Sequence, residues 1–173
     1  TGALTLSGTP TQNQTLTATS TIADLDGLGT LAYAWQRSTD AASWSTITGA
    51  AAATYTLSQS DVGFYIRSVA SYTDALGTPE SVASTPTATK VANLNDSPTG
   101  ALTLSGTPTQ NQTLTATSTI ADLDGLGTLA YTWQRSTDAA SWSTITAAAA
   151  ATYTLSQSDV GFYIRSRVSY TDA

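Results

Sequence analysis

The chain is dominated by one long internal repeat. Residues 1–75 return as residues 99–173, a period of 98 residues, with only four substitutions: Ala34/Thr132, Gly49/Ala147, Val69/Arg167 and Ala70/Val168. A period of this length corresponds to a whole domain, because the units of solenoid proteins span only about 20–50 residues. The sequence therefore predicts two domains that share one fold.

The segment between the two copies has the character of a linker. It reads V-A-N-L-N-D-S-P-T-G over residues 91–100, and Pro98 restricts the backbone of the residue before it. Side-chain oxygens are concentrated at Asn93, Asn95 and Asp96. We predict a first domain over residues 1–92, a linker over residues 93–98 and a second domain over residues 99–173.

Short runs in which apolar residues alternate with small or polar ones predict strands throughout each copy. In the first copy, Leu31, Tyr33 and Trp35 alternate with smaller or polar residues. Residues 63–73 form the longest such run, and its substituted positions place Ile66 on the buried face and Arg67 on the solvent-facing one. Further strands are expected over 4–7, 14–20, 43–48, 54–57, 80–83 and 87–91, with one capped helical turn over 58–61. About seven short strands separated by turns are typical of a β-sandwich, so the expected fold class is all-β.

The second copy matches only the first 75 residues of the first. Residues 80–91 are expected to pair with the strand over 63–73, so the equivalent strand over 161–171 should have an open edge. Such an edge is a template for another strand. Three outcomes follow: the second sandwich persists as an incomplete one, it borrows a strand from a neighbouring molecule, or the complete domain is instead 76–173.

Charge and composition exclude several kinds of partner. The net charge is −6, which disfavours nucleic acid and anionic membrane surfaces because both attract basic patches. The chain has no cysteine and no histidine, so thiolate metal sites, disulfides and histidine-based proton transfer are excluded. No apolar run is long enough to span a bilayer. Divalent cations remain compatible with this composition.

Two motifs and the general strand pattern carry a family resemblance. The segment Ala23-Asp24-Leu25-Asp26-Gly27 and the linker over residues 93–98 resemble the acidic loop and inter-domain linker of cadherins. Trp35, with the Asp61-x-Gly63-x-Tyr65 pattern, is similar to immunoglobulin-like domains. The combination resembles the tandem extender repeats of giant type I-secreted (RTX) bacterial adhesins. This resemblance implies an extracellular spacer at the bacterial cell surface, whose partners are neighbouring repeats of the same chain.

The acidic loops are the candidate metal site. Ca²⁺ takes six to eight oxygen ligands from carboxylates, amides and backbone carbonyls. In an immunoglobulin topology, the loop after the second strand lies beside the loop after the sixth, where the chain also enters. For the second copy, the expected Ca²⁺ ligands are therefore Asn93, Asn95, Asp96, Asp122, Asp124 and Asp172; for the first copy they are Asp24, Asp26 and Asp74, with Glu80 as a further candidate. The alternative is that these aspartates only cap their own turns.

Two other functions are compatible with parts of the sequence. Trp44 and Trp142 could stack on a sugar ring, which would make the chain a glycan-binding module, whereas Trp35 and Trp133 are expected in the core. Catalysis would have to use the carboxylates of Asp24 and Asp26. These two sit two residues apart in a small turn, so we expect no enzyme. Self-association through the open strand edge is a further possible contact.

Overall fold

The protein is all-β and divides into two compact units. The structure, a computed structural model, describes residues 2–172. Unit 1 is Thr1–Leu94 and unit 2 is Asn95–Ala173, so the division falls inside the segment predicted as the linker. Strands account for 43% of the chain and helix for 4%. Within the described part of the chain, no helix has both the length and the apolar character needed to cross a membrane.

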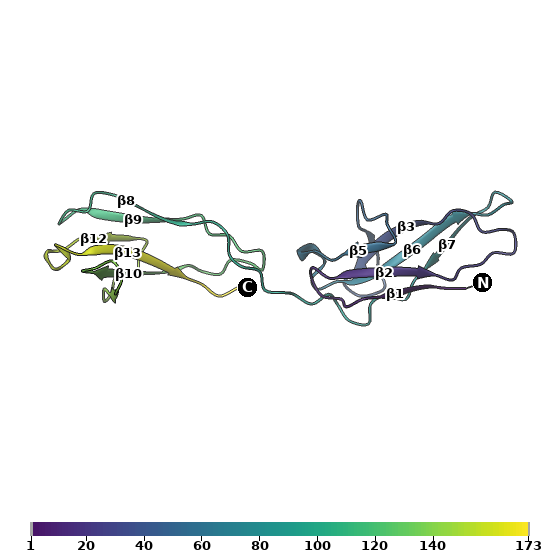
Figure 1. Cartoon of the computed structure of the whole chain (residues 1–173), viewed down its shortest axis with the longest axis horizontal. Helices are drawn as coiled ribbons and strands as arrows, with labels where there is room; N and C mark the ends of the chain where they lie inside the picture. The colour runs from purple at the N-terminus through teal and green to yellow at the C-terminus, as the bar shows by residue number, and fades with distance from the viewer. Residues whose placement is uncertain (1, 173) are drawn as a thin grey trace. The chain divides into compact units, whose positions relative to one another are not determined.

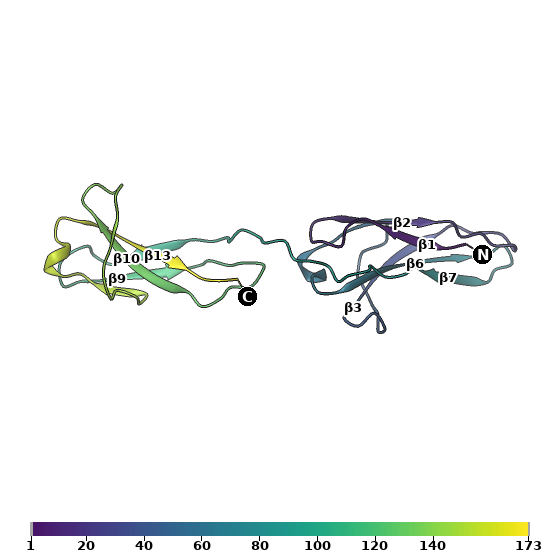
Figure 2. The same ribbon diagram turned by 90° about the horizontal axis from the view of Figure 1, so that it is seen from below.

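Unit 1 consists of two open antiparallel sheets. The first has the strand order β1-β2-β5 and the second the order β4-β3-β6-β7. Figure 2 shows β1 and β2 in one layer and β3, β6 and β7 in the other. The elements are β1 (Leu4–Ser7), β2 (Thr15–Ser20), β3 (Ala32–Ser38), β4 (Ser45–Thr46), β5 (Thr54–Thr56), the 3₁₀ turn η1 (Gln59–Asp61), β6 (Tyr65–Thr73) and β7 (Pro79–Ala83).

Unit 2 repeats this arrangement with one strand fewer among its described residues. Its sheets have the orders β12-β9-β8 and β11-β10-β13, and Figure 1 labels most of these strands. The elements are β8 (Leu102–Ser105), β9 (Thr113–Ser118), β10 (Ala130–Ser136), β11 (Ser143–Thr144), β12 (Thr152–Thr154), η2 (Gln157–Asp159) and β13 (Tyr163–Ser169). The edge of β13 predicted to be open pairs with no strand in residues 95–172.

Each unit has its core between its two sheets, as in a β-sandwich. In unit 1, Leu16 of β2 and Ile66 of β6 belong to one buried cluster centred on Trp35, which is 0% exposed. The indole Nε1 of Trp35 donates a hydrogen bond of 2.9 Å to the carbonyl of Ala52, which satisfies the buried N–H. Trp133 occupies the same place in unit 2 and is also 0% exposed. The prediction that both tryptophans are core residues is confirmed.

The predicted faces of the longest strand are also confirmed. Ile66, Ser68 and Ala70 are each 0% exposed, and the residues that alternate with them on β6 are half-buried or exposed. The helical turn predicted at residues 58–61 forms as η1. The backbone N–H of Ser58 donates to the carboxylate of Asp61 at 2.9 Å, as a capping box requires.

Two strand predictions were wrong in extent. The strand predicted over residues 43–48 reduces to Ser45–Thr46, because Asp40 accepts backbone hydrogen bonds from Ala42 and Ser43 and holds that end in a turn. The strand predicted over residues 87–91 does not form. There the hydroxyls of Ser84 and Thr87 accept the amides of β6 in place of backbone carbonyls. Only a single bridge, between Val91 and Val62, remains.

Candidate metal centre

The two loops predicted to be neighbours do meet in each unit. In unit 1, the backbone N–H of Ala75 donates to the carbonyl of Asp26 at 3.2 Å. In unit 2, Leu126 and Asp172 form an isolated antiparallel bridge. The loop after β2 or β9 therefore contacts the end of β6 or β13, as the immunoglobulin topology predicts.

In unit 1, two of the candidate ligands are engaged in local hydrogen bonds. Asp24 accepts the hydroxyl of Tyr72 at 2.7 Å and the backbone N–H of Asp26 at 2.9 Å. The bond from Tyr72 lowers the pKa of Asp24, and the same bond raises the pKa of Tyr72 to about 12. Asp74 accepts the amides of Leu76 and Thr78, which is the turn-capping alternative. Asp26 and Glu80 line a depression of about 370 Å³ with Asp24 and Tyr72.

Unit 2 keeps the aspartate–tyrosine pair. Asp122 accepts the hydroxyl of Tyr170 at 2.6 Å and the backbone N–H of Asp124 at 3.0 Å. The hydrogen bond to Asp122 raises the pKa of Tyr170 to about 12. Sequence reasoning missed this tyrosine, although Tyr72 lies at the end of β6 and Tyr170 directly follows β13, where each strand meets the loop that carries the aspartates. The aspartate at the start of the acidic motif is thereby held in a fixed orientation.

In unit 2 the acidic loop also contacts the segment that precedes the unit's first strand. The backbone N–H of Asp96 donates a hydrogen bond of 2.6 Å to Oδ2 of Asp124. The other carboxylate oxygen of Asp124, Oδ1, is buried and has no hydrogen-bond partner in the described residues. A buried carboxylate oxygen accepts but cannot donate, so this atom needs a donor or a cation.

The carboxylate of Asp172 is close enough to those of Asp122 and Asp124 for electrostatic repulsion between them. Desolvation raises the pKa of Asp172, and repulsion from Asp122 and then Asp124 raises it further. A cation between these groups would relieve that repulsion. The amide of Asn95 donates to the carbonyl of Asp96 at 3.1 Å, and Asp96 is the residue whose N–H contacts Asp124. Asn93 belongs to unit 1.

The residues of unit 2 fit Ca²⁺ only as part of a mixed ligand set. Among residues 2–172, no three Asp, Glu, His or Cys side chains are arranged to hold a metal ion by themselves. Asp124 nevertheless offers an unpaired buried oxygen, and Asp172 offers a carboxylate destabilised by its neighbours. Ca²⁺ binding there would also need amide or backbone oxygens, such as those of the Asn95–Asp96 segment.

The aromatic candidates for glycan binding are partly covered. The guanidinium of Arg67 lies 4.3 Å from the ring centroid of Trp44, and that of Arg165 lies 4.2 Å from Trp142. Arg67 is itself held by a hydrogen bond of 2.8 Å from Nε to Gln36. One face of each indole is therefore occupied by a cation–π contact.

Comparison with known proteins gives a family and no function. The sequence model of a family described as a domain of unknown function, DUF8696, matches residues 6–93 and again residues 104–172. The two matches follow the two copies of the repeat. No curated protein matches the chain.

Proposed function

The chain belongs to the DUF8696 family, and we propose that it is a structural extender of a large bacterial surface adhesin. In this role, two immunoglobulin-like sandwiches in tandem hold a distal binding domain away from the cell. Ca²⁺ at unit 2 fixes the linker residues Asn95 and Asp96 against the acidic loop of that unit. The site of action is extracellular, and the partners are neighbouring repeats of the same chain.

The hydrogen bond from Asp96 to Asp124 is the observation that carries this proposal. It joins the end of the linker directly to the acidic loop of unit 2, and it leaves Oδ1 of Asp124 buried and unpaired. A cation bound at that oxygen would hold the linker and the loop together, so metal binding would be coupled to order in the linker.

The strand orders support the immunoglobulin-like part of the proposal. In unit 1 the first, second and fifth strands form one sheet, and the fourth, third, sixth and seventh form the other. This is the division of strands found in constant-type immunoglobulin sandwiches, apart from the fourth strand. The covered indoles of Trp44 and Trp142 favour a structural role over the glycan-binding alternative.

The test compares two equivalent aspartates. Asp124→Asn removes charge from the loop that contacts Asp96, whereas Asp26→Asn makes the same change in unit 1, whose described residues include no counterpart of Asp96. We expect Ca²⁺ to raise the melting temperature of the wild-type chain relative to chelator, and Asp124→Asn to remove most of that gain. Asp26→Asn should retain the gain from unit 2.

Small-angle scattering then tests the mechanical role. With Ca²⁺, the longest interatomic distances should spread over a smaller range than with chelator, because the linker samples fewer conformations. Identical melting temperatures and identical scattering profiles in the two conditions would remove Ca²⁺ from the proposal. Mg²⁺ at the same concentration serves as the control for ionic strength.

A further inference from the structure

Two of the four substitutions between the copies fall on one cross-strand pair. In unit 1, Ala34 of β3 lies opposite Val69 of β6, and in unit 2 the same positions carry Thr132 of β10 and Arg167 of β13. The replacement of Val69 by Arg167 is the only one of the four that changes charge. An apolar pair in one unit is therefore a polar, positively charged pair in the other.

Both positions lie on the solvent side of the sheet. Thr132 alternates along its strand with Trp133, which is 0% exposed in the core. Val69, which holds the position of Arg167 in unit 1, is half-buried even though β7 pairs with β6 there. In a sheet with that additional strand the position is still accessible, so the site does not depend on what lies beside β13.

A second arginine precedes Arg167 by two residues on the same face of β13. Arg165 is held in a fixed orientation, because its Nε donates a hydrogen bond of 2.8 Å to Gln134 and its guanidinium lies 4.2 Å from the ring centroid of Trp142. Residues two apart on a strand have Cα atoms about 7 Å apart. This face therefore carries two guanidinium groups close together, one of which is already oriented.

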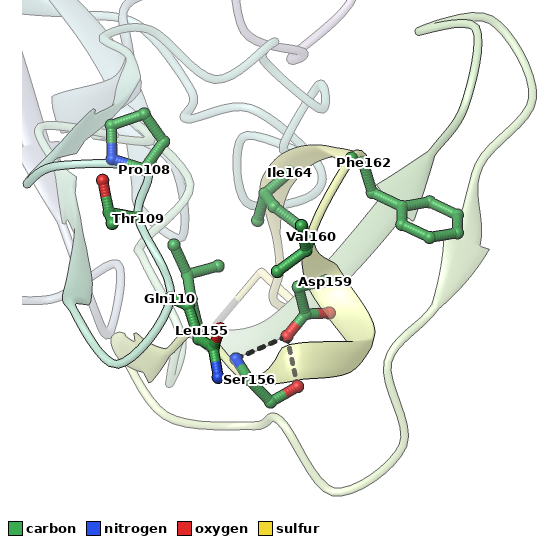
Figure 3. Close-up of a pocket in the computed structure, with 10 residues that line it drawn as sticks. Pro108, Thr109, Gln110, Leu155, Ser156, Asp159, Val160, Phe162 and Ile164 are labelled. Carbon is green, nitrogen blue, oxygen red and sulfur yellow. Dashed lines mark hydrogen bonds between the residues drawn. The ribbon is translucent and has the colours of Figure 1, made fainter.

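Neither arginine is paired with a carboxylate in residues 2–172. Arg167 makes no hydrogen bond in the same residues, and Arg165 uses only its Nε. The carboxylate of Asp159, earlier in the same stretch of chain, is occupied by Ser156, as Figure 3 shows, and by Arg135. Each of the two guanidinium groups thus keeps N–H donors without a protein acceptor.

Neutral polar groups lie beside the two charges. The lining of a hollow of about 200 Å³ includes Thr132, Gln134, Thr144 and Arg167. Thr144 of β11 lies opposite Gln134 of β10, and its hydroxyl accepts the amide of Gln134 at 3.4 Å. The hollow therefore extends across β11, β10 and β13. Its chemistry matches a ligand that carries an anionic group together with hydroxyls.

We propose that this face of unit 2 binds a carboxylate-bearing sugar, such as a uronic acid residue of an anionic polysaccharide. Arg167 pairs with the carboxylate in the bidentate geometry that guanidinium groups favour, and Arg165 adds a second positive charge. The hydroxyls of Thr132 and Thr144 bond to those of the sugar. Trp142 orients Arg165 and is not itself a platform for the sugar ring. This binding goes beyond the spacer role and requires no Ca²⁺.

Two other anionic partners fit this face less well. Nucleic acid is disfavoured by the net charge of −6, because the field of the whole protein governs its approach. An acidic peptide gains affinity from backbone pairing or from apolar pockets. The backbone groups between β10 and β13 already pair with each other, and the side chains around the two arginines are mostly polar.

Unit 1 provides a natural comparison. It keeps the first arginine in the same setting, since Arg67 donates to Gln36 at 2.8 Å and lies 4.3 Å from the ring centroid of Trp44. It has Ala34 and Val69 where unit 2 has the threonine and the second arginine. We therefore expect the sugar to bind to unit 2 and not to unit 1.

The experiment is a calorimetric titration of the full chain with trigalacturonate in the presence of chelator. We expect one binding site per chain. The double variant Thr132→Ala, Arg167→Val should bind about tenfold or more weakly, because it loses the charged hydrogen bonds. It should remain folded, since unit 1 carries the same pair. The reverse variant Ala34→Thr, Val69→Arg should create a second site in unit 1.

Three further ligands and one control sharpen the result. Maltotriose, which is neutral, and inorganic sulfate at equal ionic strength should bind far more weakly than trigalacturonate. Equal affinity for triaspartate would overturn the proposal, because the face would then recognise charge alone. Absence of binding at millimolar trigalacturonate, or equal binding by the double variant, would also overturn it. The gain in melting temperature with Ca²⁺ should be unchanged in the double variant, so this proposal and the spacer role fail independently.

Discussion

The hydroxyl of Tyr55 donates a hydrogen bond of 2.7 Å to Oδ2 of Asp61, a carboxylate that is 0% exposed. The same oxygen accepts the amide and hydroxyl of Ser58 at 2.9 and 2.8 Å, and Oδ1 lies 3.4 Å from Arg37. Desolvation and the bond to Asp61 raise the pKa of Tyr55 to about 12. This buried carboxylate ties η1 to β5 and β3, and Asp159 repeats the arrangement in unit 2.

The first prediction concerns this carboxylate. Asp61→Ala should cost about 3 kcal/mol of unfolding free energy, the lower end for a broken buried ion pair, because Arg37 keeps contact with water. Tyr55→Phe should cost about 1–3 kcal/mol, since it removes one donor from a buried charge. Urea denaturation measures both, with Ser81→Ala, at an exposed position of β7, as control. A cost for Asp61→Ala no larger than that of the control would contradict the structural role.

The second prediction compares two tryptophans of unit 1. Trp35→Ala should cost about 3–5 kcal/mol, because it empties the centre of the core. Trp44→Ala should cost about 1 kcal/mol or less, the scale of its cation–π contact with Arg67. Thermal unfolding followed by circular dichroism measures the difference. Similar losses for the two variants would argue against a core centred on Trp35.

The sequence predicted burial correctly where a residue type strongly prefers either the core or the solvent. The substitution pattern of the two copies identified the buried face of β6, since Val69 changes to Arg167 and the alternate residues remain compatible with a core. Trp35 could be placed in the core because it shares a face with Tyr33, which packs against the same cluster. The contact between the acidic loop and the loop after β6 was predicted from the order of the strands alone.

Contacts made by side chains in place of the backbone escaped the same reasoning. Residues 84–91 alternate like a strand, but Pro86 cannot donate, and the hydroxyls of Ser84 and Thr87 take over the pairing with β6. The bond between Tyr72 and Asp24 joins residues 48 positions apart, and periodicity has no signal for such a pair. The same holds for Arg67 over Trp44.

The third prediction is that the stability of the chain depends on pH in the acidic range. Backbone hydrogen bonds from Ser43 and Ala42, with one from the Ser38 hydroxyl, lower the pKa of Asp40 to about 2, and the equivalent bonds do the same for Asp138. An unfolded aspartate titrates near about 3.9, so the unfolded chain binds these protons first. The stabilisation is therefore complete above about pH 4 and is lost as the pH falls towards 2.

Urea denaturation at several pH values between 6 and 2 checks this dependence. The double variant Asp40→Asn, Asp138→Asn should lose less stability than the wild-type chain on going from pH 4 to pH 2. Parallel curves for the two proteins would show that these turns do not contribute to acid sensitivity.

The last prediction uses a glycine substitution to separate two requirements for Ca²⁺ binding, the position of the acidic loop and the charge that it carries. In unit 2, a methyl group on Gly127 would overlap the carbonyl oxygen of Thr171, and Gly29 has the same relation to Thr73 in unit 1. Gly127→Ala should therefore push the loop that carries Asp124 away from the strand end that carries Asp172, while every carboxylate remains present. If Ca²⁺ needs both loops, calorimetric titration should show weaker binding for Gly127→Ala. Gly29→Ala, which strains unit 1 equally, should leave the binding by unit 2 unchanged, and an equal loss in both variants would indicate that Ca²⁺ does not depend on this pairing of loops.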